Sequence, residues 1–207
     1  MTFDSNVPRR AVLTGGAAIA AAAVTSACSA QTPSGEAAVS AASAIPPATV
    51  IRRASADSAV LFLSRSGNTR VLATAIARRS NADLIEIRPR EAWPEEYQEM
   101  VDWASRWKDS ATPLPLAQDY DLTQYRRIYL GFPVWGTSLP APMRSLLAGA
   151  NLSGKTVTPV ITHGNYGPGD AMDVLRASVR GATIEESFIL PCPQERTTLE
   201  KLDAWLA

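Results

Sequence analysis

A regular alternation of short apolar runs and longer amphipathic stretches, beginning near residue 59, constrains the fold more than any other feature of the sequence. Residues 59–63 (AVLFL) form a continuous apolar run of strand length, as expected for a strand that is covered on both faces. Similar runs predict strands at 83–87, 127–131, 156–162 and 183–190. Helical patterns predict helices at 69–79, 94–107, 143–147, 170–179 and 197–206. Strict alternation of strand and helix is typical of a parallel sheet between two layers of helices.

Five strands in one domain, residues 58–207, suit an α/β fold of three layers. We expect a five-stranded parallel sheet of order 2-1-3-4-5 with helices on both faces. Such a sheet binds its ligand at the carboxyl ends of strands 1 and 3. The loops after Leu63, Gly131 and Thr162 are therefore the places where binding residues are expected.

The loop after the first strand reads SRSGNT and opens directly into a helix. Gly67 allows a tight turn and a close approach of the backbone to a ligand. The free N–H groups at the start of a helix attract an anion. The loop has neither the lysine of a nucleotide-hydrolysing P-loop nor the three spaced glycines of a dinucleotide-binding turn. It predicts a phosphate site without a metal, and a plain capped turn is the alternative. The residues concerned are Ser64, Arg65, Ser66, Gly67, Asn68 and Thr69.

The segment VLFLSRSGNT at residues 60–69 resembles the phosphate loop of flavodoxins, in which an apolar strand runs into S/T-x-S/T-G-N-T. Arg65 departs from the pattern, because a small hydroxyl residue is common at that position. The resemblance covers about residues 58–207. It implies a flavodoxin-like fold, FMN as the cofactor, and flavin contacts in the other two loops.

The second loop, residues 131–143, is similar to the G-x-P-x-W-x-x-x-x-P segment with which flavodoxin-like proteins cover one face of the isoalloxazine ring. An indole on a proline-flanked loop offers a flat stacking surface, and Gly136 allows the backbone to reorient beside the flavin. Trp135 could instead fill the core. The flavin contacts expected here are Pro133, Val134, Trp135 and Gly136.

The third loop, residues 162–169, matches the T-x-G-rich loop that follows strand 4 in the same family. Its glycines expose backbone donors and acceptors that suit the pyrimidine edge of the flavin, and Tyr166 could stack on the second face of the ring. The expected contacts are Thr162, His163, Gly164, Asn165, Tyr166 and Gly167.

Residues 1–30 are expected to be an export signal, because Arg9 and Arg10 precede an uncharged stretch rich in Ala and Gly. The paired arginines resemble the bacterial twin-arginine signal, and an ordinary secretory signal is the alternative. Cys28 could be the lipidated residue of a lipoprotein, or cleavage could follow Ala27 or Ala30. Residues 31–57 have few large apolar side chains and are expected to form a disordered Ala/Ser/Pro tether.

The composition excludes several classes of function. Lys and Arg total 20, as do Asp and Glu, so no net charge attracts nucleic acid. Cys28 and Cys192 belong to no cysteine or histidine cluster, and no metal is expected. The single histidine, His163, and the absence of a G-x-S-x-G motif argue against a serine hydrolase. Catalytic residues are not assigned.

Residues 100, 103, 104 and 107 follow helical spacing, which predicts core packing.

These observations together predict an FMN-binding redox protein that works outside the cytoplasm, in the periplasm or attached to the membrane through Cys28. Its partner is expected to be a redox protein or a small-molecule electron donor or acceptor. An electron carrier and an NAD(P)H- or quinone-type reductase would use the same flavin site, so both stay open. A binding module of the same fold without flavin is the alternative.

Overall fold

The computed structural model describes residues 48–192 and 202–206. The export signal expected at 1–30, Cys28 and the first part of the expected closing helix lie outside these residues. No helix within the described ranges has the length and apolar character needed to cross a bilayer.

The sheet confirms the expected order of parallel strands. Strands β2 (Ser58–Phe62), β3 (Asp83–Glu86), β4 (Arg127–Pro133) and β5 (Thr156–His163) are joined by β6 (Thr183–Ile184) and β7 (Phe188–Pro191), which both pair with β5. Their spatial order is β3-β2-β4-β5, followed by β6 and β7 along the outer edge of β5. All these pairings are parallel, so the order 2-1-3-4-5 holds. An antiparallel strand, β1 (Val50–Ile51), adds a further edge beside β3.

The expected fifth strand consists of two short pieces, β6 and β7, and together with β1 these give the described part of the chain a sheet of seven strands in place of five. Val157 pairs with Ile184 and Val160 pairs with Phe188. Three steps along β5 thus correspond to four steps along its neighbour, which is the signature of a bulge. Glu185 lies in the extra stretch, where its carboxylate pairs with Arg127.

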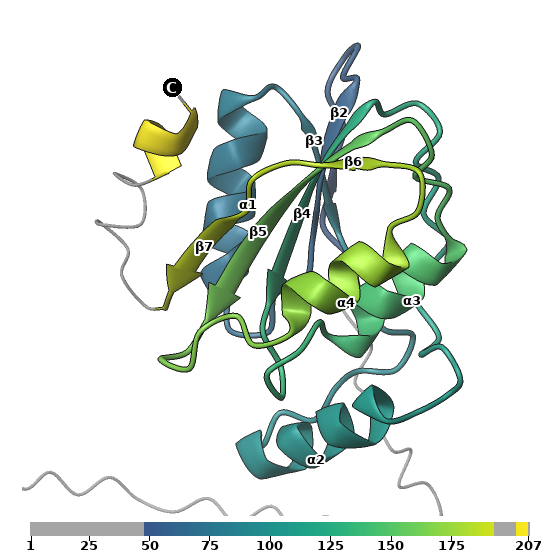
Figure 1. Ribbon diagram of the computed structural model, residues 1–207, viewed down its shortest axis with the longest axis vertical. Coiled ribbons are helices and arrows are strands. Elements are labelled where there is room, and N and C mark those ends of the chain that lie inside the picture. Colours follow the sequence, from purple (N-terminus) through teal and green to yellow (C-terminus); the bar gives the residue numbers. More distant parts are fainter. Residues whose placement is uncertain (1–47, 193–201, 207) are drawn as a thin grey trace, which may run out of the picture. The chain divides into compact units, whose positions relative to one another are not determined.

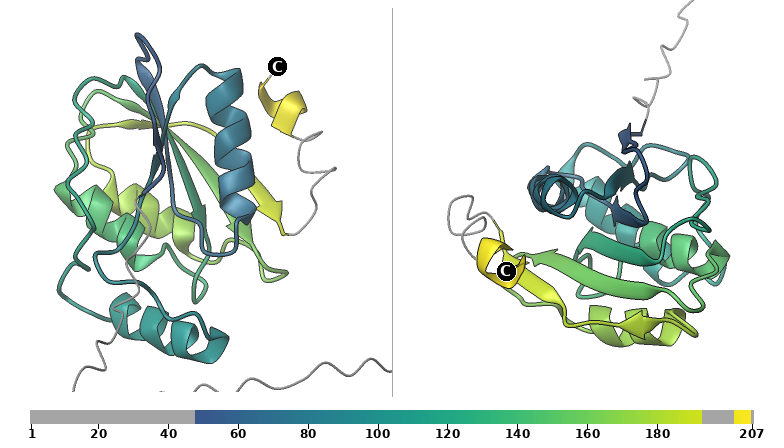
Figure 2. Two further views of the ribbon diagram at one scale, coloured as in Figure 1. Left: turned by 180° about the vertical axis from the view of Figure 1, so that it is seen from behind. Right: turned by 90° about the horizontal axis from the view of Figure 1, so that it is seen from above.

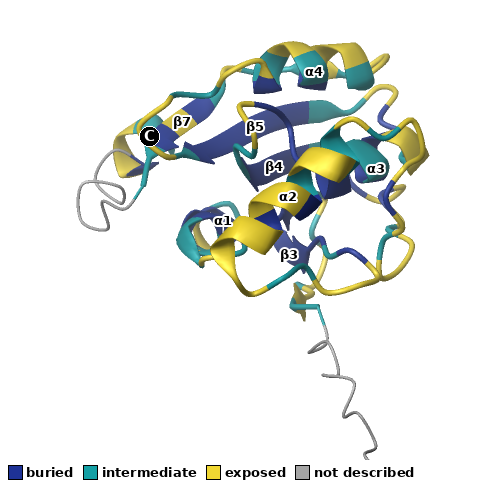
Figure 3. Cartoon of the chain, turned by 90° about the horizontal axis from the view of Figure 1, so that it is seen from below, coloured by how far each residue is buried: buried dark blue, intermediate teal, exposed yellow. Residues whose placement is uncertain are grey.

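Within residues 48–192 four helices alternate with the strands, and their bounds agree with the predicted ones within a few residues: α1 (Asn68–Arg79), α2 (Tyr97–Lys108), α3 (Ala141–Gly149) and α4 (Ala171–Ser178). Helix α1 covers one face of the sheet, and α3 and α4 cover the other (Figures 1 and 2). Residues 202–206 are helical and add Leu202 to the face of α1. Helix α2 lies across the carboxyl ends of the strands (Figures 1 and 3).

Side chains of β2 alternate between the two layers of the core. Leu61 packs in the cluster under α3 and α4, and Phe62 packs in the cluster under α1. Both side chains are fully buried. The short apolar strand is therefore covered on both faces, as its continuous apolar sequence predicts.

The tether expected over 31–57 is wrong for residues 48–57, which belong to the folded domain. Val50 pairs with Ile85 across the antiparallel edge, and the Arg53 amide donates to the Asp83 carboxylate at 2.6 Å. The side chains of Val50 and Ile51 are exposed, so apolar burial does not hold this segment. Its backbone is held by strand pairing and by two buried carboxylates of β3. The tether is predicted from the lack of large apolar residues, and that criterion does not detect an attachment made by backbone hydrogen bonds.

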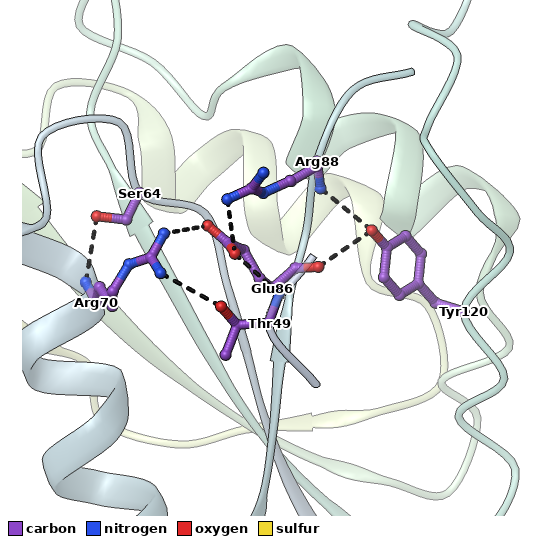
Figure 4. Close-up of polar contacts among 6 residues, drawn as sticks. All are labelled: Thr49, Ser64, Arg70, Glu86, Arg88 and Tyr120. Carbon is purple, nitrogen blue, oxygen red and sulfur yellow. Dashed lines mark hydrogen bonds and ion pairs between the residues drawn. The ribbon is translucent and has the colours of Figure 1, made fainter. Parts of the chain in front are cut away.

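Glu86 is the centre of that attachment (Figure 4). Its side chain is 1% exposed, and it accepts from the Thr49 amide at 3.0 Å. Arg70 of α1 and Arg88 contact the two carboxylate oxygens at 2.5 and 3.1 Å. A buried carboxylate is tolerated when charged and polar donors surround it in this way. Thr49 is thereby joined to β3 and to the first turn of α1.

Candidate functional site

The three loops meet at one edge of the sheet because β2, β4 and β5 are neighbours. The hydroxyl oxygens of Thr69 and Thr162 lie 2.8 Å apart, both buried, and join the first loop to the third. The Val134 amide donates to the Thr162 carbonyl at 2.8 Å, which joins the second loop to the third. The structure therefore brings together the three groups of residues that the sequence singles out.

The first loop leaves a set of backbone donors free. Gly67 is the N-cap of α1 and adopts φ = 95°, in the left-handed region. In the described part of the chain, the amides of residues 66–69 donate no hydrogen bond. The buried Ser64 hydroxyl accepts from the next amide, that of Arg70, at 3.2 Å. Free amides at a helix N-terminus suit a phosphate group, so this part of the expected cofactor fits the residues present.

The second loop turns back on itself within four residues. Trp135 and Ser138 exchange two backbone hydrogen bonds of 3.2 and 3.1 Å, and the two residues between them have positive φ: 55° at Gly136 and 62° at Thr137. This is the pattern of a type I′ turn. The Asp170 amide donates to the Thr137 carbonyl at 2.9 Å. The turn is thus fixed against the chain that follows the third loop.

Gly169 is required for that contact. A Cβ atom at this position would lie 1.9 Å from the Thr137 carbonyl oxygen, which is far inside contact distance. Gly169 also has φ = 56°, a conformation that other residues rarely adopt. Gly169 is therefore needed for close packing of the two loops. The sequence alone does not show whether a glycine in such a loop serves close packing or flexibility.

Trp135 packs edge-to-face against two other indoles. Its ring centroid lies 5.9 Å from that of Trp93 and 6.4 Å from that of Trp103, with interplanar angles of 84° and 78°. The side chain is only partly buried. Trp135 therefore takes part in core packing, one of the two roles left open by the sequence, and its stacking on a flavin stays a prediction.

Helix α2 and the first two loops enclose a groove of about 170 Å³. Arg65 and three residues of the second loop (Val134, Trp135 and Gly136) line one side of it. The other side is lined by α2, with Tyr97, Met100, Val101, Ala104, Ser105 and Lys108. The sequence analysis assigned no part of the site to α2. A line of residues at i, i+4, i+7 and i+11, from Tyr97 to Lys108, is the signal that could have found it.

Hydrogen bonds to the first two loops hold α2 in this place. Arg65 donates to the Glu95 carbonyl at 2.6 Å, and Lys108 donates to the Gly136 carbonyl at 2.9 Å. Met100 and Trp103 are 4% and 8% exposed and Ala104 and Trp107 pack against them, which confirms the predicted core stripe. Helix α2 is thus anchored at both ends, with one side in the core and one side toward the groove.

The third loop is the most open of the three. Tyr166 is 92% exposed, and Gly164 and Asn165 are exposed beside it. His163 lies at the end of β5, with Nδ1 next to the Gly164 carbonyl oxygen. These residues border the site without closing it, so their expected flavin contacts stay predictions.

Cys192 lies next to the third loop, where its amide donates to the His163 carbonyl at 2.9 Å. Burial raises the pKa of its thiol, which disfavours the reactive thiolate form. Among the residues that the structure describes, no three His, Cys, Asp or Glu side chains gather where a metal ion could bind.

A sequence model of the family Flavodoxin matches residues 57–207. The chain belongs to the flavodoxin family. The resemblance seen in the three loop motifs is thereby confirmed, and membership of this family supports FMN as the cofactor of the domain. No curated protein matches the chain.

Solved structures with this fold include a candidate flavoprotein from Bacteroides uniformis ATCC 8492, with 24% identity over 73% of this chain and 97% of that one, and a TM-score of 0.62. A candidate flavoprotein from Bacteroides eggerthii DSM 20697 has 21% identity over 72% and 95% of the two chains, and the same TM-score of 0.62. A flavoprotein from Lactobacillus acidophilus NCFM, in complex with FMN, has 18% identity over 72% and 99%, and a TM-score of 0.54. At these identities the likeness shows that the flavodoxin domain shares their fold.

Proposed function

We propose that this flavodoxin binds FMN at the three loops and transfers electrons outside the cytoplasm, as an electron carrier or as an NAD(P)H- or quinone-type reductase. The proposal rests on the free amides of residues 66–69, which suit a phosphate group. They lie at the carboxyl edge of the sheet, where the loop that carries Trp135 and the groove beside α2 also lie. FMN, when bound, supplies the transfer of electrons or hydride.

The chain's own residues have separate tasks in this proposal. The amides of residues 66–69 bind the phosphate, and the Ser66 and Asn68 side chains can add polar contacts. The second loop and α2 offer apolar walls to the ring, and the open third loop can offer backbone groups to its polar edge. The buried Thr69–Thr162 hydrogen bond keeps the first and third loops at a constant distance.

Export rests on the twin arginines Arg9 and Arg10 and the weakly apolar stretch after them. Lipidation of Cys28 would keep the domain at the membrane, and its absence would release it. Fractionation of cells that express the full chain separates these cases, when compared with a variant in which both arginines are replaced by lysine. A twin-arginine substrate stays inside the cell in that variant.

The flavin is tested first on purified protein. Absorbance bands near ~370 and ~450 nm are expected, and the apoprotein should quench the fluorescence of added FMN at one equivalent. Steady-state turnover with NAD(P)H and a quinone then indicates a reductase, whereas fast exchange with a redox protein alone indicates a carrier. A folded protein that holds no flavin and does not quench added FMN would support the flavin-free binding module.

A further inference from the structure

The groove between α2 and the first two loops has an unbalanced charge. Of the described residues that line it, Arg65 and Lys108 are cationic and none is acidic. The two cations sit near opposite ends of α2, since Arg65 donates to the carbonyl of Glu95 and Lys108 is the last residue of the helix. A ligand in this groove would therefore lie between two positive charges.

Lys108 is the less compensated of the two cations. Arg65 lies near Glu96, the N-cap residue of α2, whose pKa is lowered mainly by backbone hydrogen bonds and in a smaller part by Arg65. Lys108, in contrast, forms no ion pair with any residue in the described ranges. Among the described residues, no carboxylate in an ion pair therefore neutralises the positive charge that Lys108 places beside the groove.

The Lys108 ammonium group is held in place by the second loop. Its Nζ donates to the Gly136 carbonyl at 2.9 Å, and the same oxygen accepts from the Thr137 hydroxyl at 2.6 Å. The Gly136 carbonyl is part of the type I′ turn, which Asp170 fixes to the chain that follows the third loop. The positive charge is thus positioned by the loop that is expected to contact the flavin ring.

We propose that Lys108 is a positioning residue that closes α2 onto the Gly136 turn and sets the reduction potential of the bound flavin. The inference rests on the proposed function. Uptake of two electrons and one proton adds one negative charge to a neutral flavin ring, and a fixed cation beside the ring stabilises that charge. The ratio of the affinity for reduced FMN to the affinity for oxidised FMN is therefore higher with Lys108 than it would be in the same site without the cation.

The size of this effect is limited because Lys108 is partly exposed and solvent screens its charge. We expect Lys108→Gln to lower the preference for reduced over oxidised FMN about five- to tenfold. For a two-electron couple this corresponds to a fall in midpoint potential of ~20–30 mV, since a tenfold change equals about 30 mV.

Two matched variants separate the charge from other effects. Lys108→Arg keeps the cation and the donor, and its potential should stay close to that of the unchanged protein. Arg106→Gln removes a cation from the same helix at an exposed position that does not line the groove, and it should leave the potential unchanged. The difference between Lys108→Gln and the unchanged protein should also shrink at 1 M salt.

Titration of each apoprotein with oxidised FMN comes before the measurement of potential. If the unchanged protein does not bind FMN, the proposed function fails and this inference fails with it. If all variants bind FMN and the potential of Lys108→Gln equals that of the unchanged protein, the role of Lys108 is refuted while FMN binding stands. An equal fall in potential for Arg106→Gln would also overturn the proposal, because it would show a nonspecific effect of net charge.

Discussion

Thr69 and Thr162 share a buried hydrogen bond of 2.8 Å between their hydroxyl oxygens, across two loops that lie 93 residues apart in the sequence. Each hydroxyl is the other's partner in a place from which water is excluded. Removing one hydroxyl breaks this hydrogen bond inside the core, whereas removing both leaves an apolar contact between the two positions.

Thr69→Val should therefore cost about 1–3 kcal/mol of unfolding free energy, and so should Thr162→Val. The double variant should cost clearly less than the sum of the two. Denaturant unfolding of the four proteins measures the coupling. Thr69→Ser serves as the control, because it keeps the hydroxyl. Additive effects of the two valines would mean that the hydroxyls do not depend on one another.

Gly67 gives a test of the phosphate site. Its φ of 95° is unfavourable for residues with a side chain, and nothing lies within 4 Å of a Cβ atom built there. Gly67→Val should lose flavin retention, because a β-branched residue would pull the backbone out of this conformation at a cost of roughly 1–2 kcal/mol or more. Gly67→Asn is the matched control, since asparagine tolerates the left-handed region. Circular dichroism checks the fold, and full flavin content in the valine variant would refute the assignment.

Trp135 should affect both stability and FMN binding. Trp135→Ala removes its contacts with Trp93 and Trp103, and we expect a loss of about 2–4 kcal/mol of unfolding free energy. It should also cost about 1–3 kcal/mol of FMN affinity if the indole contacts the ring, and make the flavin easier to reduce. Trp135→Phe keeps an aromatic ring and should recover most of both. Lower stability with unchanged FMN affinity would restrict Trp135 to packing.

The N-terminal edge strand should contribute to stability. A protein that begins at residue 58 lacks β1 and leaves the buried Glu86 and Asp83 without the amides of Thr49 and Arg53. We expect it to lose about 2–4 kcal/mol relative to a protein that begins at residue 48. Replacing Val50 and Ile51 together by Ala in the longer protein should cost under ~1 kcal/mol, because both side chains are exposed. Equal melting of the two lengths would show that β1 adds nothing.

Asp83 should make the fold sensitive to acid. Burial raises the pKa of Asp83, but hydrogen bonds from Tyr125, from the Arg53 amide and from Arg52 outweigh burial and bring its pKa below the usual 3.8. A carboxyl group with a lowered pKa stabilises the fold above the unfolded-state value and loses that contribution as the pH falls below about 4. Unfolding free energy measured from pH 7 to pH 3 should show this fall. Tyr125→Phe should make this fall smaller, because it removes a hydrogen bond that keeps the pKa of Asp83 low, and an unchanged profile would contradict this account.

The sequence predicts the parallel strand order and the three loops because both depend on local patterns. Apolar runs and helix starts are set by neighbouring residues, and the meeting of the loops follows from the strand order. The bulge at Glu185 and the position of α2 could not be predicted in this way. Both depend on long-range contacts, such as that of Glu185 with Arg127 and that of Lys108 with Gly136.

The direction of β1 decides from which side the domain is tied to whatever precedes it. Because β1 runs antiparallel to β3, Thr49 lies beside Glu86, at the same edge of the sheet as the three loops. A parallel strand would have brought the chain in at the far edge. If the domain is anchored upstream of residue 48, as proposed, the anchor therefore holds it from the edge that carries the three loops. In that case the distance from a membrane anchor to the three loops is limited by the length of the chain before residue 48 and not by the thickness of the domain.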